Sequence, residues 1–157
     1  LWKALLDDRL DIIATDHAPH SIEETANSYL KAPSGGPLVQ HSLPVMLDFY
    51  HQGKISLAKV VEKMCHAPAV CFEVDRRGYI REGYWADLAF IDPDQPWEVR
   101  PSNIFYKCGW SPFEEHTFSA KITHTFVNGN LMFEAEPQLL ENHFDESARG
   151  MRLKFNR

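Results

Sequence analysis

The sequence predicts an α/β fold in its first half and β-structure in its second half, from three observations. The β-branched run 11–15 follows a helical turn and is typical of a strand buried on both faces. Residues 38–72 repeat apolar side chains with the period of helices. After residue 74, alternating apolar runs flank an Asn-Gly pair, the strongest short signal for a β-hairpin.

The first elements follow the order helix, strand and polar loop. Residues 1–8 predict an amphipathic helical turn, and "DIIAT" at 11–15 predicts the buried strand. The polar stretch "DHAPHS", residues 16–21, comes directly after it. Chemical groups in α/β units cluster where strands end and loops begin, so this stretch is the first candidate for a site.

A long shaped loop and two helices are predicted next. Residues 21–37 show no sustained period and contain two prolines and two glycines, and loops of this length are often functional. The first helix, within 38–53, ends at Gly53. The second, within 56–72, has Ser56 as its N-cap and is expected to break at Pro68.

The remaining residues have β character. "ADLAFID" at 86–92 predicts a strand, and "KITHTFVNGNLMFEA" at 121–135 predicts a hairpin that turns at Asn128-Gly129. The tail from Pro137 to Arg157 is polar and mixed, which predicts a poorly ordered extension.

Composition excludes several classes of protein. The formal net charge of −6 argues against sequence-independent nucleic-acid binding, and no apolar run reaches the roughly 18 residues of a membrane-spanning helix. Three cysteines without a Cys-x-x-Cys pair indicate reduced thiols in a cytoplasmic protein. The N-terminus lacks a signal-peptide pattern. It also lacks a start methionine and a helix-opening signal, from which we expect a segment of a longer polypeptide.

Asp16, His17 and His20 are the residues best placed to carry chemistry. Together they could coordinate a metal or act as acid and base. A catalytic zinc needs at least three protein ligands, so the pattern is not a complete metal site. The alternatives are that Asp16 caps a helix or turn and that His17 braces the loop. The other histidines are expected to be structural or solvated: His41, His51, His66, His116, His124 and His143.

Several motifs resemble one enzyme family. "ATDHAPH" at 14–20, followed by "KAPSGG" at 31–36, resembles the C-terminal part of dihydroorotases in the amidohydrolase superfamily. "KCGWSPFEEHTF" at 107–118 and the "VNGN" turn are similar to the same family, so the resemblance covers roughly residues 1–135. Hydantoinases and allantoinases share the strand-end Asp-His but are not expected to have the second histidine, so His20 favours dihydroorotase.

The resemblance implies a metal-dependent (β/α)₈ barrel with a small composite β domain. Residues 1–74 would form the last strand and helices of the barrel, 75–136 the C-terminal half of the β domain, and 137–157 a C-terminal extension. Asp16 would end the eighth strand, bind zinc and shuttle protons, and His20 would hold the substrate carboxylate. Ser34 and Gly35 would meet the substrate ring through their backbone, although family members often carry a larger residue at the position of Ser34.

The implied reaction is the reversible interconversion of N-carbamoyl-L-aspartate and L-dihydroorotate in de novo pyrimidine biosynthesis, with one or two zinc ions. The family's His-x-His pair is absent from this sequence, and a barrel needs roughly 200 residues or more. The chain alone is therefore expected to be inactive, with the rest of the same polypeptide as its partner and a homodimer as the family's common assembly. The alternatives are a non-catalytic amidohydrolase-like scaffold subunit and a hydantoinase- or allantoinase-type cyclic amidase.

Overall fold

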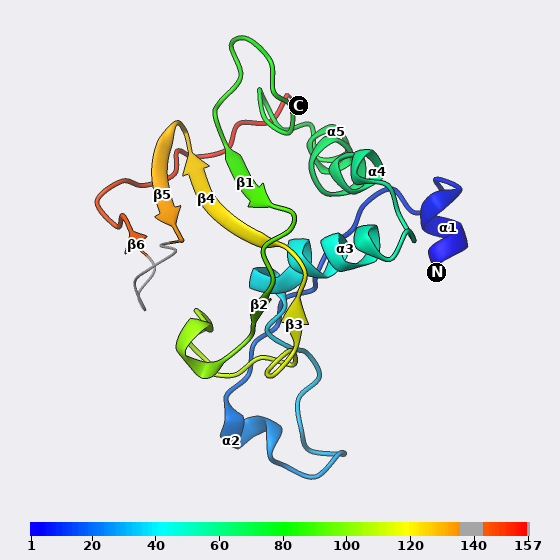
Figure 1. The fold of residues 1–157 in the computed structure, drawn as a ribbon, viewed down its shortest axis with the longest axis vertical. Coiled ribbons are helices and arrows are strands. Elements are labelled where there is room, and N and C mark those ends of the chain that lie inside the picture. The colour runs from blue at the N-terminus through cyan, green and yellow to red at the C-terminus, as the bar shows by residue number, and fades with distance from the viewer. Residues whose placement is uncertain (136–142, 157) are drawn as a thin grey trace.

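A computed structural model describes residues 1–135 and 143–156 (Figure 1). Helices come first: α1 Trp2–Leu6, α2 Ile22–Thr25, η1 Val39–His41, α3 Ser42–His51, α4 Leu57–Val61, η2 Glu62–His66 and α5 Ala67–Cys71. They are followed by β1 Leu88–Asp92, β2 Trp97–Glu98, η3 Pro101–Asn103, β3 Thr117–Phe118, β4 Lys121–Val127, β5 Asn130–Glu134 and β6 His143–Phe144. The change from helices to strands after residue 74 is as the sequence predicts.

The predicted strand at residues 11–15 is not formed. Its one backbone hydrogen bond to a distant element runs from the Ile13 N–H to the Lys63 carbonyl, at 3.1 Å. The nearest bridge lies further along, where His17 pairs with Gly36 in parallel. A strand needs a neighbouring strand to complete its ladder of hydrogen bonds, and the described residues place none beside this run. The strand prediction is therefore wrong for this chain.

The two predicted helices are present, and one detail differs. Ser56 caps α4 as predicted, its Oγ accepting a hydrogen bond from the Lys59 N–H at 3.2 Å. The predicted break at Pro68 is wrong, because helical structure runs through it from residue 57 to residue 71. The five residues before α5, η2, form a π-helix. Pro68 then lies in the first turn of α5, where a proline is tolerated because its missing N–H is not needed.

The helical part has its own apolar core. Met46, Ile55 and Val60 are buried, and α1 packs against them through Trp2 and Leu5. The Trp2 ring also lies edge-on to the Phe49 ring of α3, with centroids 4.7 Å apart. This packing fixes the start of the chain, and with it the approach to residues 16–20.

The second half contains an antiparallel sheet with the strand order β1-β4-β5-β6. The predicted hairpin is confirmed: β4 and β5 are joined by Asn128 and Gly129, whose φ angles are 53° and 83°. Positive φ at both positions is the requirement of a type I′ turn, which Asn-Gly meets at little cost. A smaller ladder joins β2 to β3, pairing Trp97 with Phe118.

The tail is ordered where the structure describes it. β6 pairs with β5, and Phe155 forms a bridge with Val74. The Asp75 N–H also donates to the Lys154 carbonyl at 2.8 Å. The expectation of a poorly ordered extension is thus wrong for residues 143–156, because backbone hydrogen bonds attach this segment to the rest of the chain. Residues 137–142 and 157 lie outside the described residues.

Helix α3 connects the helical and β parts. The Asp48 carboxylate accepts hydrogen bonds from the Ser119 N–H and hydroxyl, at 2.9 and 2.6 Å, and lies 3.0 Å from the His116 ring. These hydrogen bonds hold the pKa of Asp48 below its usual value although burial opposes them as the largest single contribution. α3 lies at the centre of the molecule, and α2 with the loop after it extends away (Figure 1). Within the described ranges, no helix is long and apolar enough to cross a membrane.

Candidate functional site

Asp16 carries a carboxylate that nothing else in the described chain uses. The side chain is exposed, and it makes no hydrogen bond or ion pair with any described residue. Its backbone is in the left-handed region, with φ at 47°, a conformation that aspartate tolerates better than most residues. The cap of the following helix is Ser21 instead. The helix-cap alternative for Asp16 is therefore wrong.

His17 braces the loop, which is one of the roles considered for it from sequence. Its Nδ1 accepts hydrogen bonds from the backbone N–H groups of Leu38 and Val39, at 3.0 and 3.3 Å. An imidazole nitrogen that accepts hydrogen bonds carries no proton, so the ring proton is on Nε2. This atom of His17 is committed to the backbone and is not a free metal ligand.

His20 lies directly before the capping box of α2. Its Nδ1 is 3.7 Å from a carboxylate oxygen of Glu24, and its side chain is partly exposed. Its backbone carbonyl accepts a hydrogen bond from the Trp110 indole N–H at 2.8 Å. The position of His20 is thus fixed through its main chain, while its ring stays accessible to solvent.

The structure brings Gly35 against the same stretch. A Cβ atom on Gly35 would lie 2.6 Å from the Ala18 Cβ and 2.8 Å from the Ala18 carbonyl oxygen, too close for any real side chain. The Ala18 N–H donates to the Gly36 carbonyl at 3.2 Å. Ser34 precedes this contact and is exposed. The loop predicted to meet a ligand through its backbone therefore lies beside residues 16–20.

A third segment, residues 103–111, completes the arrangement. The Tyr106 hydroxyl accepts a hydrogen bond from the Gln40 N–H at 2.9 Å and lies 3.1 Å from Nδ1 of His41. Sequence reasoning missed Tyr106 and Trp110 as parts of the site: Trp110 belongs to a motif used only for the family resemblance, and Tyr106 directly precedes that motif. An available signal was the concentration of aromatic residues within "FYKCGW".

His41 is fully buried, as a structural histidine would be. Its ring stacks on those of Trp97 and Phe118, with centroids 6.0 and 5.7 Å away. Burial lowers the pKa of His41 to about 4, so the imidazole is neutral at pH 7. Its Nδ1 faces the hydroxyls of Tyr106 and Ser111, while its Nε2 has no hydrogen-bond partner within residues 1–135 and 143–156.

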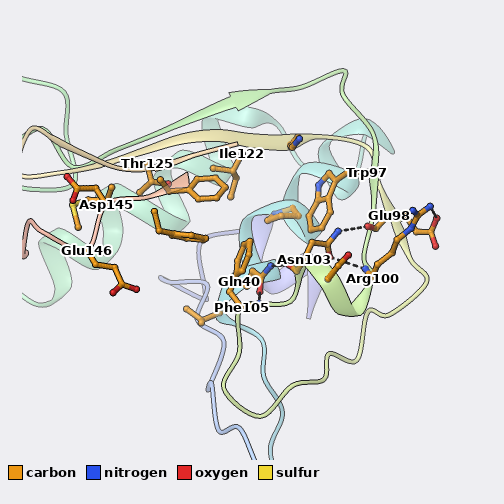
Figure 2. A pocket seen from close by; sticks show the side chains of 17 residues that line it. Gln40, Trp97, Glu98, Arg100, Asn103, Phe105, Ile122, Thr125, Asp145 and Glu146 are labelled. Atoms are coloured by element: carbon orange, nitrogen blue, oxygen red, sulfur yellow. Dashed lines mark hydrogen bonds and ion pairs between the residues drawn. The ribbon is translucent and has the colours of Figure 1, made fainter. Parts of the chain in front are cut away.

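A large cavity lies elsewhere, with a volume of about 900 Å³ (Figure 2). It opens between the start of α3 and strands β4 to β6, and its wall includes Trp97, Phe105 and Phe133. Gln40 reaches its edge, but none of the four predicted site residues lines it. The cavity and the candidate site are therefore separate places on the molecule.

The described residues do not form a metal site by themselves. No group of three or more histidine, cysteine, aspartate or glutamate side chains among them is arranged to hold an ion. Asp16 by itself supplies a single carboxylate ligand, and a catalytic zinc needs at least three protein ligands. The donor set on this chain therefore does not fit a metal without ligands from elsewhere.

Comparison with known proteins supports the family resemblance seen in the sequence motifs. The sequence model of the Amidohydrolase family matches residues 1–132. Dihydroorotase from Halobacterium salinarum is 38% identical over 138 residues, covering 87% of this chain and 32% of that protein. Dihydroorotase from Pyrococcus furiosus is 32% identical over 136 residues, covering 87% of this chain and 31% of that protein.

Among solved structures, L-hydantoinase (dihydropyrimidinase) from Arthrobacter aurescens superimposes with a TM-score of 0.78 and 30% identity. The match covers 90% of this chain and 32% of that one. The chain thus spans about a third of the length of the curated relatives it matches. Since the family match extends over most of its residues, this chain belongs to the amidohydrolase family.

Proposed function

We propose that this chain is the part of a dihydroorotase that supplies a proton-transferring carboxylate and a substrate-binding histidine. In the complete protein the reaction would be the reversible interconversion of N-carbamoyl-L-aspartate and L-dihydroorotate. The observation that carries the proposal is the free Asp16 carboxylate, which lies where residues 16–20 meet the loop at Gly35. An unpaired carboxylate beside a substrate can accept a proton and return it to a leaving nitrogen.

His20 and the loop at Gly35 would bind the substrate. A histidine ring can donate a hydrogen bond to a substrate carboxylate, and such charge-assisted bonds are among the stronger ones in proteins. Gly35 has no side chain, so its backbone and that of Ser34 can approach a ring closely. Residues 16–20 and 33–36 would thus form one wall of the site, and the other wall would come from the rest of the polypeptide.

Membership of the amidohydrolase family implies a metal cofactor, and we propose that the metal is zinc, as one or two ions. Asp16 would be one ligand, and the remaining ligands would lie outside this chain. This follows from the incomplete donor set among the described residues. The chain alone would then be inactive, because neither the ion nor the substrate would be fully enclosed.

We further propose how the chain is divided. Residues 1–74 would close the barrel, 75–136 would complete a small β domain, and 137–157 would be an extension. We place the enzyme in the cytoplasm as a homodimer. Its three cysteines form no disulfide with one another, which fits a reducing compartment.

A hydantoinase-type cyclic amidase is the second candidate, favoured by the TM-score of 0.78 to L-hydantoinase. Both reactions open a cyclic amide, so the substrate decides between them. Turnover of dihydroorotate by the purified complete protein supports the first candidate. Turnover of hydantoin without turnover of dihydroorotate would support the second, and turnover of neither would support the scaffold alternative.

The Asp16→Asn variant of the complete protein tests the role of the carboxylate. Because asparagine cannot accept a proton, turnover should fall by roughly 10²- to 10⁴-fold. Asp11→Asn is the matched control, since Asp11 is also exposed but precedes the site. The measurement is steady-state hydrolysis of dihydroorotate with zinc present. Wild-type turnover by the Asp16→Asn variant would remove Asp16 from the mechanism.

A further inference from the structure

We infer that Tyr106 is a positioning residue of the site: its hydroxyl anchors the substrate loop, residues 33–40, to residues 103–111. The inference rests on the proposed function, because the loop is the part that would meet the substrate. Tyr106 itself would touch neither substrate nor metal.

The loop ends at three backbone N–H groups that bond side chains. The three successive N–H groups of Leu38, Val39 and Gln40 all donate to side chains distant in sequence. His17 Nδ1 accepts from the first two, and the Tyr106 hydroxyl accepts from the third at 2.9 Å. These groups stand at the start of η1, where a helix leaves its first N–H groups without internal partners. Two side chains therefore hold the helix start, and the loop that leads into it, in one position.

The Tyr106 hydroxyl also has a proton to donate. Because the Tyr106 oxygen accepts from Gln40, its own proton is free to be donated, and His41 Nδ1 lies 3.1 Å away. The buried, neutral imidazole can accept that proton in a hydrogen bond. The Tyr106 hydroxyl is thus held from both sides. Phenylalanine would leave the Gln40 N–H without this partner.

The segment that carries Tyr106 also bonds the Gln40 side chain. The Gln40 side chain donates to the Asn103 carbonyl at 2.7 Å and accepts from the Phe105 N–H at 2.9 Å, so residue 40 is attached to this segment by both its main chain and its side chain. Figure 2 shows Gln40 close to Asn103 and Phe105 at the edge of the cavity. Four residues after Tyr106, Trp110 donates to the His20 carbonyl. One segment therefore fixes the loop and His20 relative to each other.

The test uses Tyr106→Phe in the complete, zinc-loaded protein, with two readouts. Amide hydrogen exchange should become faster in the peptide that covers residues 33–41 and stay unchanged in the hairpin, residues 121–134. The value of kcat/KM for dihydroorotate should fall by about tenfold or more, because small displacements of positioning groups are costly to catalysis. Zinc content should stay at the wild-type level.

Two matched variants separate positioning from general loss of structure. Ser111→Ala removes the other hydroxyl that faces His41 Nδ1 but bonds no amide of the loop, so exchange in residues 33–41 should stay unchanged. Tyr84→Phe makes the same chemical change in a distant tyrosine and should retain wild-type kcat/KM.

Unchanged exchange in the loop of Tyr106→Phe overturns the inference, as does faster exchange in the loop with wild-type kcat and KM. Equal acceleration across the whole protein also overturns it, since the hydroxyl would then be a general structural element. The absence of dihydroorotate turnover in the wild type is a separate result and rejects the proposed function, whereas the exchange measurement still decides whether Tyr106 anchors the loop.

Discussion

At the residue scale, the neighbouring residues Asp16 and His17 differ in the hydrogen bonding of their side chains. Asp16 is exposed and has no polar partner among the described residues, whereas His17 uses its Nδ1 on two backbone N–H groups. A polar side chain that bonds the backbone contributes to structure, whereas a free one remains available for chemistry. The resemblance implied a chemical role for Asp16, and bracing the loop was one role considered for His17. Sequence could not name the partners of His17, because they lie more than twenty residues away.

His41 gives a pH-dependent prediction at this scale. Its pKa is lowered to about 4 by burial, whereas an unfolded histidine titrates near 6.5. Between these values the unfolded chain binds a proton that the folded chain does not, so the free energy of unfolding falls as pH falls from 6.5 toward 4. The loss from this residue at pH 4.5 should be on the order of 2 to 3 kcal/mol.

Denaturant unfolding at pH 7 and pH 4.5 measures this effect. His41→Gln should lose less stability on acidification than wild type, and His143→Gln, in which the altered histidine is exposed, should behave as wild type does. An identical acid-induced loss in wild type and His41→Gln would show that His41 does not contribute.

The residues that sequence reasoning missed share one property. Tyr106 contacts Gln40 across 66 positions, and Trp110 contacts His20 across 90. Local patterns such as a strand-end carboxylate or a glycine pair can be seen within a few residues of sequence. A hydroxyl that accepts one particular N–H from a distant loop has no such local signature, and only the folded chain places the two groups together.

At the element scale, predictions succeeded where the determinant is local. The hairpin at Asn128-Gly129 follows from the φ angles that its turn requires, and the start of α4 follows from the Ser56 cap. The strand prediction for residues 11–15 was wrong, because a strand depends on neighbouring strands that its own residues do not specify. The prediction of a helix break at Pro68 was wrong, because the π-helix before α5 places the proline in a helical first turn.

The loop at Gly35 gives a prediction at this scale. Gly35 has φ at +127° and lies in contact with Ala18, so Gly35→Ala should both strain the backbone and push the loop away from residues 16–20. The free energy of unfolding should fall by about 1 to 3 kcal/mol, and kcat/KM of the complete protein should fall with it. Denaturant unfolding and steady-state kinetics measure the two effects.

Gly36→Ala is the matched control for this prediction. Gly36 is the next residue, and no atom of the part of the chain that the structure describes lies within 4 Å of the position that its Cβ would take. Its φ is outside the left-handed region. The change should therefore alter stability by no more than about 0.5 kcal/mol. Equal effects of the two substitutions would mean that the contact with Ala18 does not determine the loop position.

At the scale of the whole molecule, three distant parts of the chain meet at the candidate site: residues 16–20, 33–41 and 103–111. The third part follows the first strands of the β half, and α3 holds that half in place through Asp48 and Ser119. The β half therefore contributes to the site even though none of the four predicted site residues belongs to it. The change from helices to strands and the β4–β5 hairpin were predictable from local patterns, whereas this convergence was not.

Metal binding gives the last prediction, because it depends on the whole polypeptide. One free carboxylate cannot satisfy the three protein ligands of a catalytic zinc, so residues 1–157 alone should retain no stoichiometric zinc after dialysis. The complete protein should retain it, and Asp16→Asn should lower its zinc affinity. Metal analysis of both forms, with Asp16→Asn made in each, is the measurement. In residues 1–157 the substitution should change nothing. Stoichiometric zinc on that chain, lost on Asp16→Asn, would mean that its own residues assemble a complete site around Asp16.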